Sequence, residues 1–355
     1  MANRVEWMIY GANGYTGRLV AVEAKHRGLR PVLAGRRAGP IETLATDLSL
    51  PARVFDLGDA RSAAAAVADM AVVAHCAGPF AATSAQMIDA CLTSRTHYLD
   101  ITGELEVFLA AQRRHADALA TGIVICPGVG FDVIPTDCLA AVLKEALPDA
   151  THLVLAFDAR ARVSPGTART MAESFRLGRR GGRVRRNGAI EQVPLAHSRR
   201  RVDFAGGSVM TTAIAWGDLA TAYVSTGIPN IETYASMPLG AAIAGHALNW
   251  AWPLLASVPV QELLRLLADR STGPSEEERR TGRSRFWGEV RNMAGERRTA
   301  RLETANGYRL TADGMIMAVK FLLEHAPAGG YYTPSMLMGA RCVEELPGST
   351  AIRVD

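Results

Sequence analysis

Three glycines at a spacing of three residues form the feature that most constrains how this chain folds. An apolar run at residues 7–10 precedes them, and residues 18–22 after them suit a helix. Glycine allows a tight turn in which the backbone approaches a phosphate, and the first amide groups of the helix bind anions. Because the spacing differs from the commoner G-x-G-x-x-G, a turn without a ligand is the alternative. We expect the dinucleotide-binding turn to include Gly11, Asn13, Gly14, Tyr15, Thr16 and Gly17.

Up to about residue 130, strand-like apolar segments alternate with helical segments. Strands are expected at residues 7–10, 31–36, 52–57, 70–76, 97–101 and 122–126. Such alternation with short connections is typical of a parallel sheet with helices on both faces. We therefore expect an α/β protein in which residues 1–133 form a Rossmann-type, doubly wound parallel sheet. Ligands bind such sheets at the carboxyl ends of the strands.

The residues after the second expected strand indicate which dinucleotide the turn binds. An acidic residue at this position favours NAD. This chain has Arg36 and Arg37 instead, and a guanidinium pairs with a 2′-phosphate through forked, charge-assisted hydrogen bonds. We therefore predict NADP(H), with Arg36 as the first phosphate-binding residue and Arg37 as the second; a solvated charge is the alternative for Arg37. Asp56, after the third strand, is predicted to meet the adenine, with helix capping as its alternative.

The segment after the fourth strand is predicted to face the ribose and the nicotinamide. Its small residues let the backbone approach a ligand, and its proline fixes a turn, although Gly-Pro is also common in ordinary loops. The predicted cofactor wall consists of Ala77, Gly78, Pro79 and Phe80.

Polar residues gather at the carboxyl end of the next strand, where catalytic residues of α/β sheets tend to lie. Tyr98 and Asp100 point to the same face, because side chains alternate along a strand. Tyr98 is predicted to be the proton donor, with Asp100 or Asp132 orienting it. Asp132 lies in the turn 128–137, which we expect to lead into a second domain. Glu104 is interpreted as the start of the following helix.

By these motifs the chain resembles the saccharopine dehydrogenase-like oxidoreductases, and within them the branch of trans-acting enoyl reductases. The residues that carry the resemblance are GANGYTG at 11–17, AGRR at 34–37, CAGPF at 76–80, YLDITGE at 98–104 and PGVGFDVIP at 127–135. The later segments TANGYRLTADG and GGYYTPSMLMGA also fit that branch. The resemblance implies a dinucleotide-binding domain, a mixed α/β second domain and a C-terminal helix that returns to the first. It also implies NADP(H) and reduction of a C=C or C=N bond, without a secure catalytic residue.

The chain of 355 residues is long enough for two or three domains. We expect a substrate and dimerisation domain at 134–328, with a mobile loop at 270–285, and a C-terminal helix and tail at 329–355. The five cysteines contain no C-x-x-C pair and no metal-ligand cluster is recognised, so we expect buried thiols and no metal. With the first strand directly at the N-terminus, we expect no signal peptide and a cytoplasmic location. A homodimer is expected.

Nine arginines fall within residues 176–201. We interpret them as a docking surface for a phosphorylated or acidic partner, such as an acyl carrier protein or a coenzyme A thioester, with a solvated face as the alternative. The net charge of only +4 and the lack of aromatic residues among these arginines do not favour nucleic acid.

Residues 233–260 contain no Asp, Glu, Lys or Arg, and the stretch is rich in apolar side chains. Prolines and polar residues interrupt it, so it does not suit a membrane-spanning helix. A buried core segment is the first interpretation. An acyl-chain groove or a peripheral membrane contact is the alternative.

Together these features predict an NADPH-dependent reductase that transfers a hydride to an activated C=C bond, on a carrier- or CoA-linked acyl chain. A saccharopine-type reductase of C=N bonds is the alternative within the enzymes. A non-catalytic NADP(H)-binding protein of a lipid surface or scaffold is the alternative from another class.

Overall fold

The computed structural model describes residues 6–159, 182–249 and 272–355, together with a few single residues between these ranges. The chain packs into two compact units, each built from two segments of sequence. The first unit contains residues 1–134 and 308–338, and the second contains residues 135–307 and 339–355.

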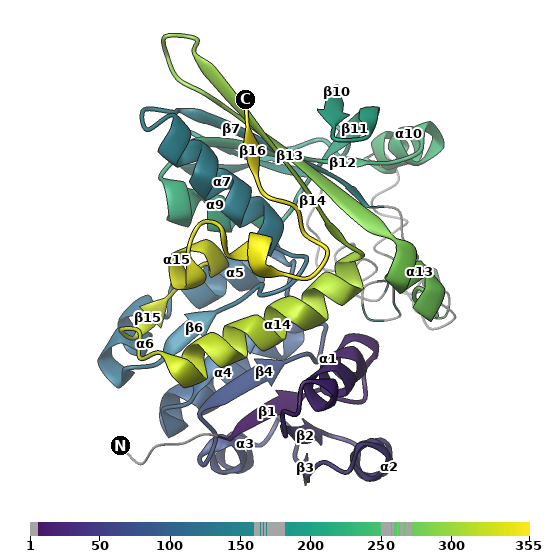
Figure 1. Ribbon diagram of the computed structural model, residues 1–355, viewed down its shortest axis with the longest axis vertical. Coiled ribbons are helices and arrows are strands. Elements are labelled where there is room, and N and C mark those ends of the chain that lie inside the picture. Colours follow the sequence, from purple (N-terminus) through teal and green to yellow (C-terminus); the bar gives the residue numbers. More distant parts are fainter. Residues whose placement is uncertain are drawn as a thin grey trace. The chain divides into compact units, whose positions relative to one another are not determined.

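A seven-stranded parallel sheet forms the centre of the first unit in the described residues (Figure 1). Its strand order, β15-β6-β5-β4-β1-β2-β3, contains the order 3-2-1-4-5-6 of dinucleotide-binding sheets. The predicted Rossmann-type sheet is therefore confirmed. The strands are β1 (Trp7–Tyr10), β2 (Val32–Gly35), β3 (Ala52–Val54), β4 (Val72–His75), β5 (His97–Asp100), β6 (Val124–Cys126) and β15 (Gly330–Tyr331).

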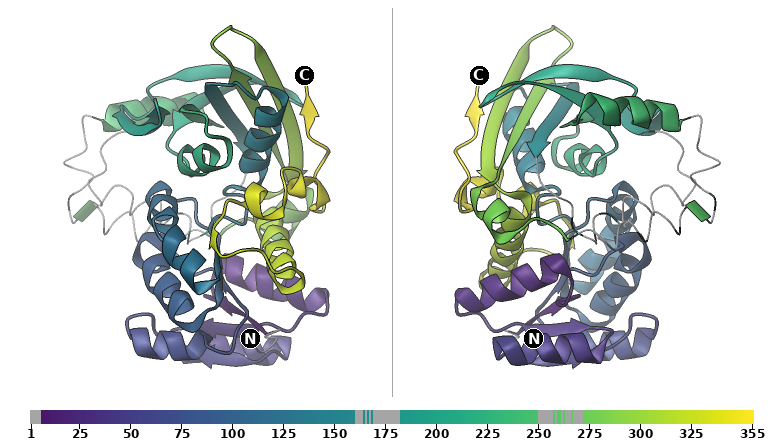
Figure 2. Two further views of the ribbon diagram at one scale, coloured as in Figure 1. Left: turned by 90° about the vertical axis from the view of Figure 1, so that its left-hand side faces the viewer. Right: turned by 90° about the vertical axis from the view of Figure 1, so that its right-hand side faces the viewer.

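Helices cover both faces of this sheet, because successive parallel strands need crossover connections. Figure 2 shows α4 to α6 (blue) on one side of the strands and α1 (purple) with α14 (yellow-green) on the other. The helices of the unit are α1 (Tyr15–His26), α2 (Ala38–Leu48), α3 (Ala60–Val67), α4 (Ser84–Ser94), α5 (Leu105–Gln112), α6 (His115–Thr121), α14 (Gly307–Glu324) and α15 (Pro334–Met338), with the short 3₁₀ helix η1 (Phe80–Ala82).

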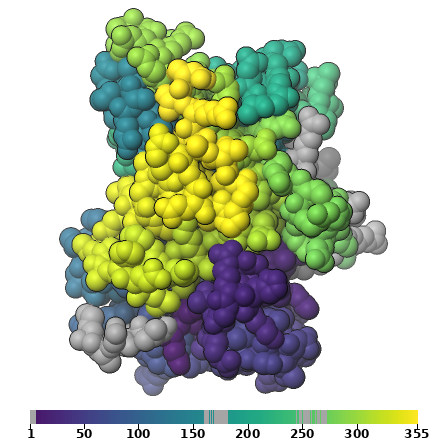
Figure 3. All heavy atoms as spheres, viewed as in Figure 1, coloured from purple at the N-terminus to yellow at the C-terminus, as the bar shows by residue number. Residues whose placement is uncertain are grey.

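Residues 308–338 pack with the first unit, whereas the sequence analysis placed 308–328 in the second domain. Two contacts explain this difference. Strand β15 extends the first sheet by pairing with β6. The buried Asp313 of α14 forms ion pairs with Arg27 of α1 and with Arg309. In Figure 3, yellow-green atoms of α14 lie against purple atoms of the first helical segment.

The second unit contains a mixed sheet that is nine-stranded in the described residues. Its main order is β10-β11-β12-β7-β13-β14-β16, and β8 and β9 form a side hairpin that pairs with β12. The strands are β7 (His152–Ala159), β8 (Gly182–Arg186), β9 (Ala189–Val193), β10 (Arg199–Phe204), β11 (Gly207–Ile214), β12 (Asn230–Ser236), β13 (Arg283–Arg291), β14 (Arg297–Ala305) and β16 (Arg353–Val354). The helices α7 (Ile134–Ala146), α9 (Asp218–Thr226), α10 (Leu239–Leu248) and α13 (Glu276–Thr281) belong to this unit, as does η2 (Cys342–Glu345).

The tail after residue 338 belongs to the second unit, not to the first. Strand β16 pairs with β14, and the thiol of Cys342 lies 3.5 Å from that of Cys138 in α7. All five cysteines are buried, and none of them forms a disulfide bond. The predicted return of 329–355 to the first domain thus applies only to residues 329–338.

The prediction of a mobile loop at 270–285 is wrong for most of the residues that the structure describes there. Residues 276–281 form α13, and β13 starts at Arg283. The hydroxyl of Ser275 accepts a hydrogen bond from the amide of Glu278, and the Glu278 carboxylate accepts one from the amide of Ser275. This reciprocal capping box satisfies amide groups that a polar loop would leave to water.

The apolar stretch 233–260 begins inside the sheet, since residues 233–236 belong to β12. Helix α10 follows and exposes the side chains of Leu239 and Ile243. Residues 250–256 lie outside the described part of the chain. Among the described residues, no helix is long and apolar enough to cross a bilayer.

Candidate functional site

The glycine turn between β1 and α1 has the close packing that a dinucleotide-binding turn requires. Gly11 has φ +82°, and a Cβ atom there would lie 2.7 Å from the amide nitrogen of Ala77. At Gly17 a Cβ would lie 2.3 Å from the carbonyl oxygen of Gly11. Gly14 is the N-cap of α1, and no side chain caps this helix. No side chain therefore competes with a phosphate for the amide groups at the start of α1.

Arg36 and Asp56 lie near each other at the ends of β2 and β3. The charges of both side chains affect the pKa of the Tyr10 hydroxyl. This hydroxyl donates a hydrogen bond to the carbonyl of Phe55. Burial raises the pKa of Tyr10 to about 12; the charge of Asp56 adds to this rise and that of Arg36 opposes it. Arg36 and Arg37 are exposed, and Arg36 forms no ion pair within the described part of the chain. The guanidinium of Arg36 is thus exposed directly after β2, where the 2′-phosphate is predicted to bind.

Asp56 accepts a hydrogen bond from the amide of Gly58, and Asp59 caps α3 through the amides of Arg61 and Ser62. The helix cap considered for Asp56 therefore belongs to Asp59. The exposed Asp56 carboxylate follows β3, and its contact with the adenine stays a prediction.

The loop after β4 holds the four predicted wall residues Ala77 to Phe80. The hydroxyl of Thr83 donates a hydrogen bond to the carbonyl of Ala77 at 2.7 Å. Because that hydroxyl has one proton, it accepts from Nε2 of His75, which lies 3.0 Å away. His75 is fully buried, and burial lowers its pKa to about 3, so the ring is neutral. Phe80 packs edge-on against this ring.

Tyr98 and Asp100 form a buried pair at the end of β5. The Tyr98 hydroxyl donates to Oδ2 of Asp100 at 2.7 Å, and both side chains are fully buried. Oδ1 of Asp100 accepts from the amides of Thr102 and Gly128, each at 2.9 Å. Burial raises the pKa of Asp100 to about 6 and that of Tyr98 well above its ordinary value. This pair ties the loops after β5 and β6 together.

Asp132 lies on the loop after β6, with its carboxyl against the backbone of Gly103. A Cβ atom on Gly103 would lie 2.6 Å from Oδ2 of Asp132. Oδ1 of Asp132 is buried and has no hydrogen-bond partner within the described part of the chain. Burial raises the pKa of this carboxyl to about 7. A carboxyl of this kind is protonated over part of the physiological range and can donate a proton.

The structure therefore brings the predicted residues to one edge of the first sheet, at the carboxyl ends of its strands. We call those at the ends of β1, β2 and β3 the adenosine half and those at the ends of β4, β5 and β6 the nicotinamide half, after the parts of NADP(H) that they are predicted to contact. The sequence analysis missed His75 and Thr83, and it assigned Glu104 only to the start of a helix. A polar residue at the carboxyl end of an apolar strand was the available signal for His75.

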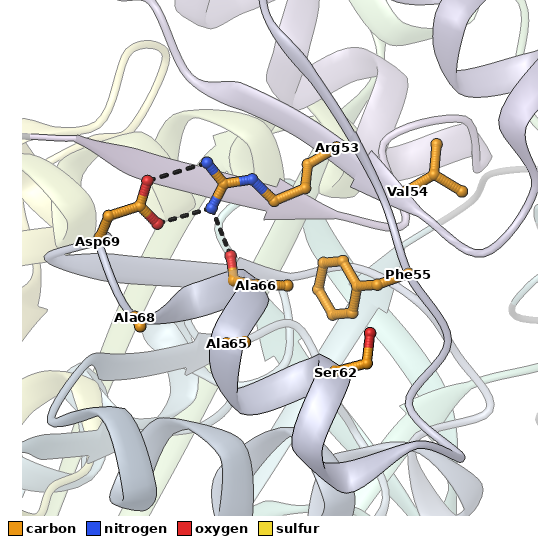
Figure 4. Close-up of a pocket in the computed structure, with 8 residues that line it drawn as sticks. All are labelled: Arg53, Val54, Phe55, Ser62, Ala65, Ala66, Ala68 and Asp69. Carbon is orange, nitrogen blue, oxygen red and sulfur yellow. Dashed lines mark hydrogen bonds and ion pairs between the residues drawn. The ribbon is translucent and has the colours of Figure 1, made fainter.

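Two shallow pockets open on the first unit. One, of about 330 Å³, lies beside the glycine turn and is lined by Asn13, Arg18, Pro40, Thr43, Leu44 and Asp47. It belongs to the adenosine half of the site, because Asn13 is in the turn. The other, of about 450 Å³, lies between β3 and α3 (Figure 4). There Arg53 and Asp69 are paired through two hydrogen bonds, so neither charge remains free for a ligand.

The comparisons with known proteins agree with this geometry. Residues 7–126 match the family model of the saccharopine dehydrogenase NADP binding domain. Trans-acting enoyl reductases of Mycobacterium bovis and Mycobacterium tuberculosis are 29% identical over 184 residues. That match covers 48% of this chain and 44% of each relative, so it spans less than half of the relatives' length.

The fold of the whole chain is similar to that of the L-Glu-forming saccharopine dehydrogenase of Saccharomyces cerevisiae. The TM-score is 0.64 over 99% of both chains, at 12% sequence identity. The glycine cradle and the free guanidinium of Arg36 fit the NADP(H) that the family model specifies. Residues 7–126 therefore match the saccharopine dehydrogenase NADP binding domain, and the chain as a whole is similar in fold to a saccharopine dehydrogenase.

Proposed function

We propose that this protein is an NADPH-dependent reductase of an activated C=C bond in a carrier- or CoA-linked acyl chain. The observation that carries the proposal is the presence of two groups at the same edge of an NADP-binding sheet. One is the free guanidinium of Arg36 in the adenosine half. The other is the buried Asp132 carboxyl in the nicotinamide half, with a pKa raised to about 7. The names of the mycobacterial relatives support reduction of an enoyl group.

The residues of this chain have separate tasks in that reaction. NADPH, when bound, supplies the hydride. The glycine turn holds the pyrophosphate, and Arg36 binds the 2′-phosphate. Asp132 holds a proton on its carboxyl and delivers it to the carbon next to the acyl carbonyl, or stabilises the enolate oxygen. Tyr98 positions Asp100, because its hydroxyl is fully buried and already donates to that carboxylate.

Cofactor titration is the first test of the proposal. Purified protein is titrated with NADPH and with NADH, with reduced-nicotinamide fluorescence as the signal. We expect tight NADPH and weak NADH binding. The same protein is then given enoyl thioesters and, separately, imines formed from an amino acid and a 2-oxo acid. NADPH oxidation by imines alone would replace the C=C proposal with C=N reduction. Tight NADPH binding without turnover of either would favour the non-catalytic alternative.

The substitution Arg36→Ala tests the assignment of the 2′-phosphate site. The loss of a charge-assisted pair should raise the Kd for NADPH roughly 10- to 100-fold. The Kd for NADH should change by less than about threefold, since NADH lacks that phosphate. Arg61→Ala, which removes another arginine of the first unit, is the control. An equal loss of affinity for both cofactors would contradict the assignment.

One arginine of the cluster, Arg185, does not fit the proposed docking of a carrier or CoA partner. Arg185 is buried; its side chain donates to the carbonyls of Leu219 and Gly188 and lies over the Tyr223 ring. Arg176, Arg179 and Arg180 lie outside the described residues. The partly or fully exposed Arg183, Arg186, Arg199, Arg200 and Arg201 remain candidates. Their replacement by Ser should raise KM for carrier-bound substrate at low salt; an unchanged KM would contradict docking here.

Dimerisation and a peripheral membrane contact stay predictions. Sedimentation of the purified protein tests the homodimer. Co-sedimentation with lipid vesicles tests whether residues 233–260 contact a membrane.

A further inference from the structure

The loop between β4 and α4 faces the nicotinamide half of the site, and the structure fixes it at three points. At its start, Ala77 packs directly on Gly11 of the glycine turn. At its end, the hydroxyl of Thr83, the N-cap of α4, donates a hydrogen bond to the carbonyl of Ala77. At η1, the carboxylate of Glu104 accepts hydrogen bonds from the amides of Phe80 at 2.8 Å and Ala81 at 3.0 Å. The third point comes from another loop of the sheet.

Glu104 is the N-cap of α5, but its side chain does not cap that helix. Glutamate is not among the residues favoured at this position, where Ser, Thr, Asp and Asn bind the following amides. Its carboxylate instead uses both oxygens on the start of η1. Carboxylate–amide bonds of this kind are about twice as strong as those between neutral groups.

The backbone next to Glu104 also touches the proposed proton donor. Gly103 lies against the Asp132 carboxyl. The amide of Glu104 donates to the hydroxyl of Thr102 at 3.1 Å, and the amide of Thr102 donates to Asp100 at 2.9 Å. Residues 102–104 are thereby held on the loop that links β5 to α5. This short segment joins the cofactor wall on one side to Asp132 on the other.

We propose that Glu104 is a positioning residue that sets the separation between the nicotinamide wall at Phe80 and the carboxyl of Asp132. The proposal rests on the proposed reduction, because it assigns Phe80 to the cofactor and Asp132 to the proton. Glu104 itself touches neither substrate nor cofactor. Its effect reaches the reaction only through η1 and Gly103.

Glu104→Gln and Glu104→Ala test the proposal, with Glu106→Gln as a charge-matched control on the same helix. The glutamine side chain places an NH₂ donor opposite a backbone amide, so at least one bond is lost while side-chain size is kept. We expect the NADPH Kd to change by less than about threefold. We expect kcat to fall about tenfold or more, since small misplacements of reacting groups are costly in rate. The deuterium isotope effect of labelled NADPH should rise as hydride transfer becomes slower.

A second measurement does not depend on turnover. Amide hydrogen exchange should accelerate at Phe80 and Ala81 in both Glu104 variants, and remain as in the wild type for Glu106→Gln. Wild-type exchange at these amides would overturn the proposal, whatever the turnover. Faster exchange with unchanged kcat and isotope effect would also overturn it, because Glu104 would then only stabilise the loop. If the wild type reduces neither thioesters nor imines, the proposed function fails separately. The exchange rates and the emission of bound NADPH then still show whether Glu104 fixes the wall.

Discussion

The Asp132 carboxyl combines burial, a free oxygen and a pKa raised to about 7, and these properties give the reaction a pH dependence. A proton donor must be protonated, so kcat should decrease as the pH rises through about 7. Asp132→Asn keeps the shape of the side chain but cannot donate a proton, and should reduce kcat by about 100-fold or more. Its residual rate should lose this pH dependence. A wild-type profile that stays flat between pH 6 and about 8.5 would exclude Asp132 as the donor.

The same carboxyl also makes folding stability depend on pH. In the folded state its pKa lies above the unfolded value of 3.8. Between these values the folded chain binds a proton that the unfolded chain releases, so this contribution to stability is lost as the pH rises towards about 7. Asp132→Asn should therefore unfold at a higher denaturant concentration than wild type at pH 8, with little difference at pH 4. The opposite order at pH 8 would contradict the buried carboxyl.

Tyr98 provides a contrasting substitution. Tyr98→Phe removes the hydrogen bond to Asp100 and leaves Oδ2 of that carboxyl without this donor. The expected cost is about 1–3 kcal/mol of unfolding free energy, measured by denaturant titration. Activity should persist at a reduced level. If Tyr98→Phe instead abolishes turnover while Asp132→Asn retains it, Tyr98 is the donor that the sequence analysis first predicted.

At the scale of single elements, the turn from β1 to α1 depends on glycines that have no room for a side chain. Gly17→Ala would place a Cβ atom 2.3 Å from the Gly11 carbonyl oxygen. This substitution should weaken NADPH and NADH by a similar factor, unlike Arg36→Ala. Gly39→Ala in α2 is the matched control, because nothing lies within 4 Å of its added Cβ. In a helix it should be neutral or stabilise by about 0.5–1 kcal/mol. Titration with both cofactors and thermal unfolding would measure these effects.

Local sequence patterns were sufficient for the elements whose partners are close in sequence. Glycine spacing and apolar runs located β1 to β6. The capping box at Ser275 was also readable, but the polar composition of 270–285 favoured a loop. The ion pair between Arg27 and Asp313 joins residues 286 positions apart, and no local pattern reports such a contact. Glu104 does start α5, as predicted, but its bonds to Phe80 and Ala81 were not foreseen for the same reason, since these partners lie on another loop.

At the scale of the molecule, Asp313 attaches the late segment 308–338 to the first unit. Its side chain is fully buried between Arg27 and Arg309. Asp313→Ala removes the buried carboxylate from this group, in which Glu23 still pairs with both guanidinium groups, and should cost about 1–3 kcal/mol of unfolding free energy. Asp69→Ala breaks the largely exposed pair with Arg53 and should cost less than about 1 kcal/mol. Denaturant unfolding followed with bound NADPH would compare them. Equal effects of the two substitutions would show that Asp313 does not stabilise the first unit.

The division of each unit between two segments has a consequence for synthesis on the ribosome. The polypeptide passes from one unit to the other near residues 134, 307 and 338. When residue 134 has emerged, the nascent sheet still lacks β15, and α1 lacks α14. The first unit to be translated is therefore completed only after most of the second unit has been made. A nascent chain stalled before residue 308 should expose the apolar edge of β6 and be a substrate for chaperones, and no single cut of the gene yields either unit intact.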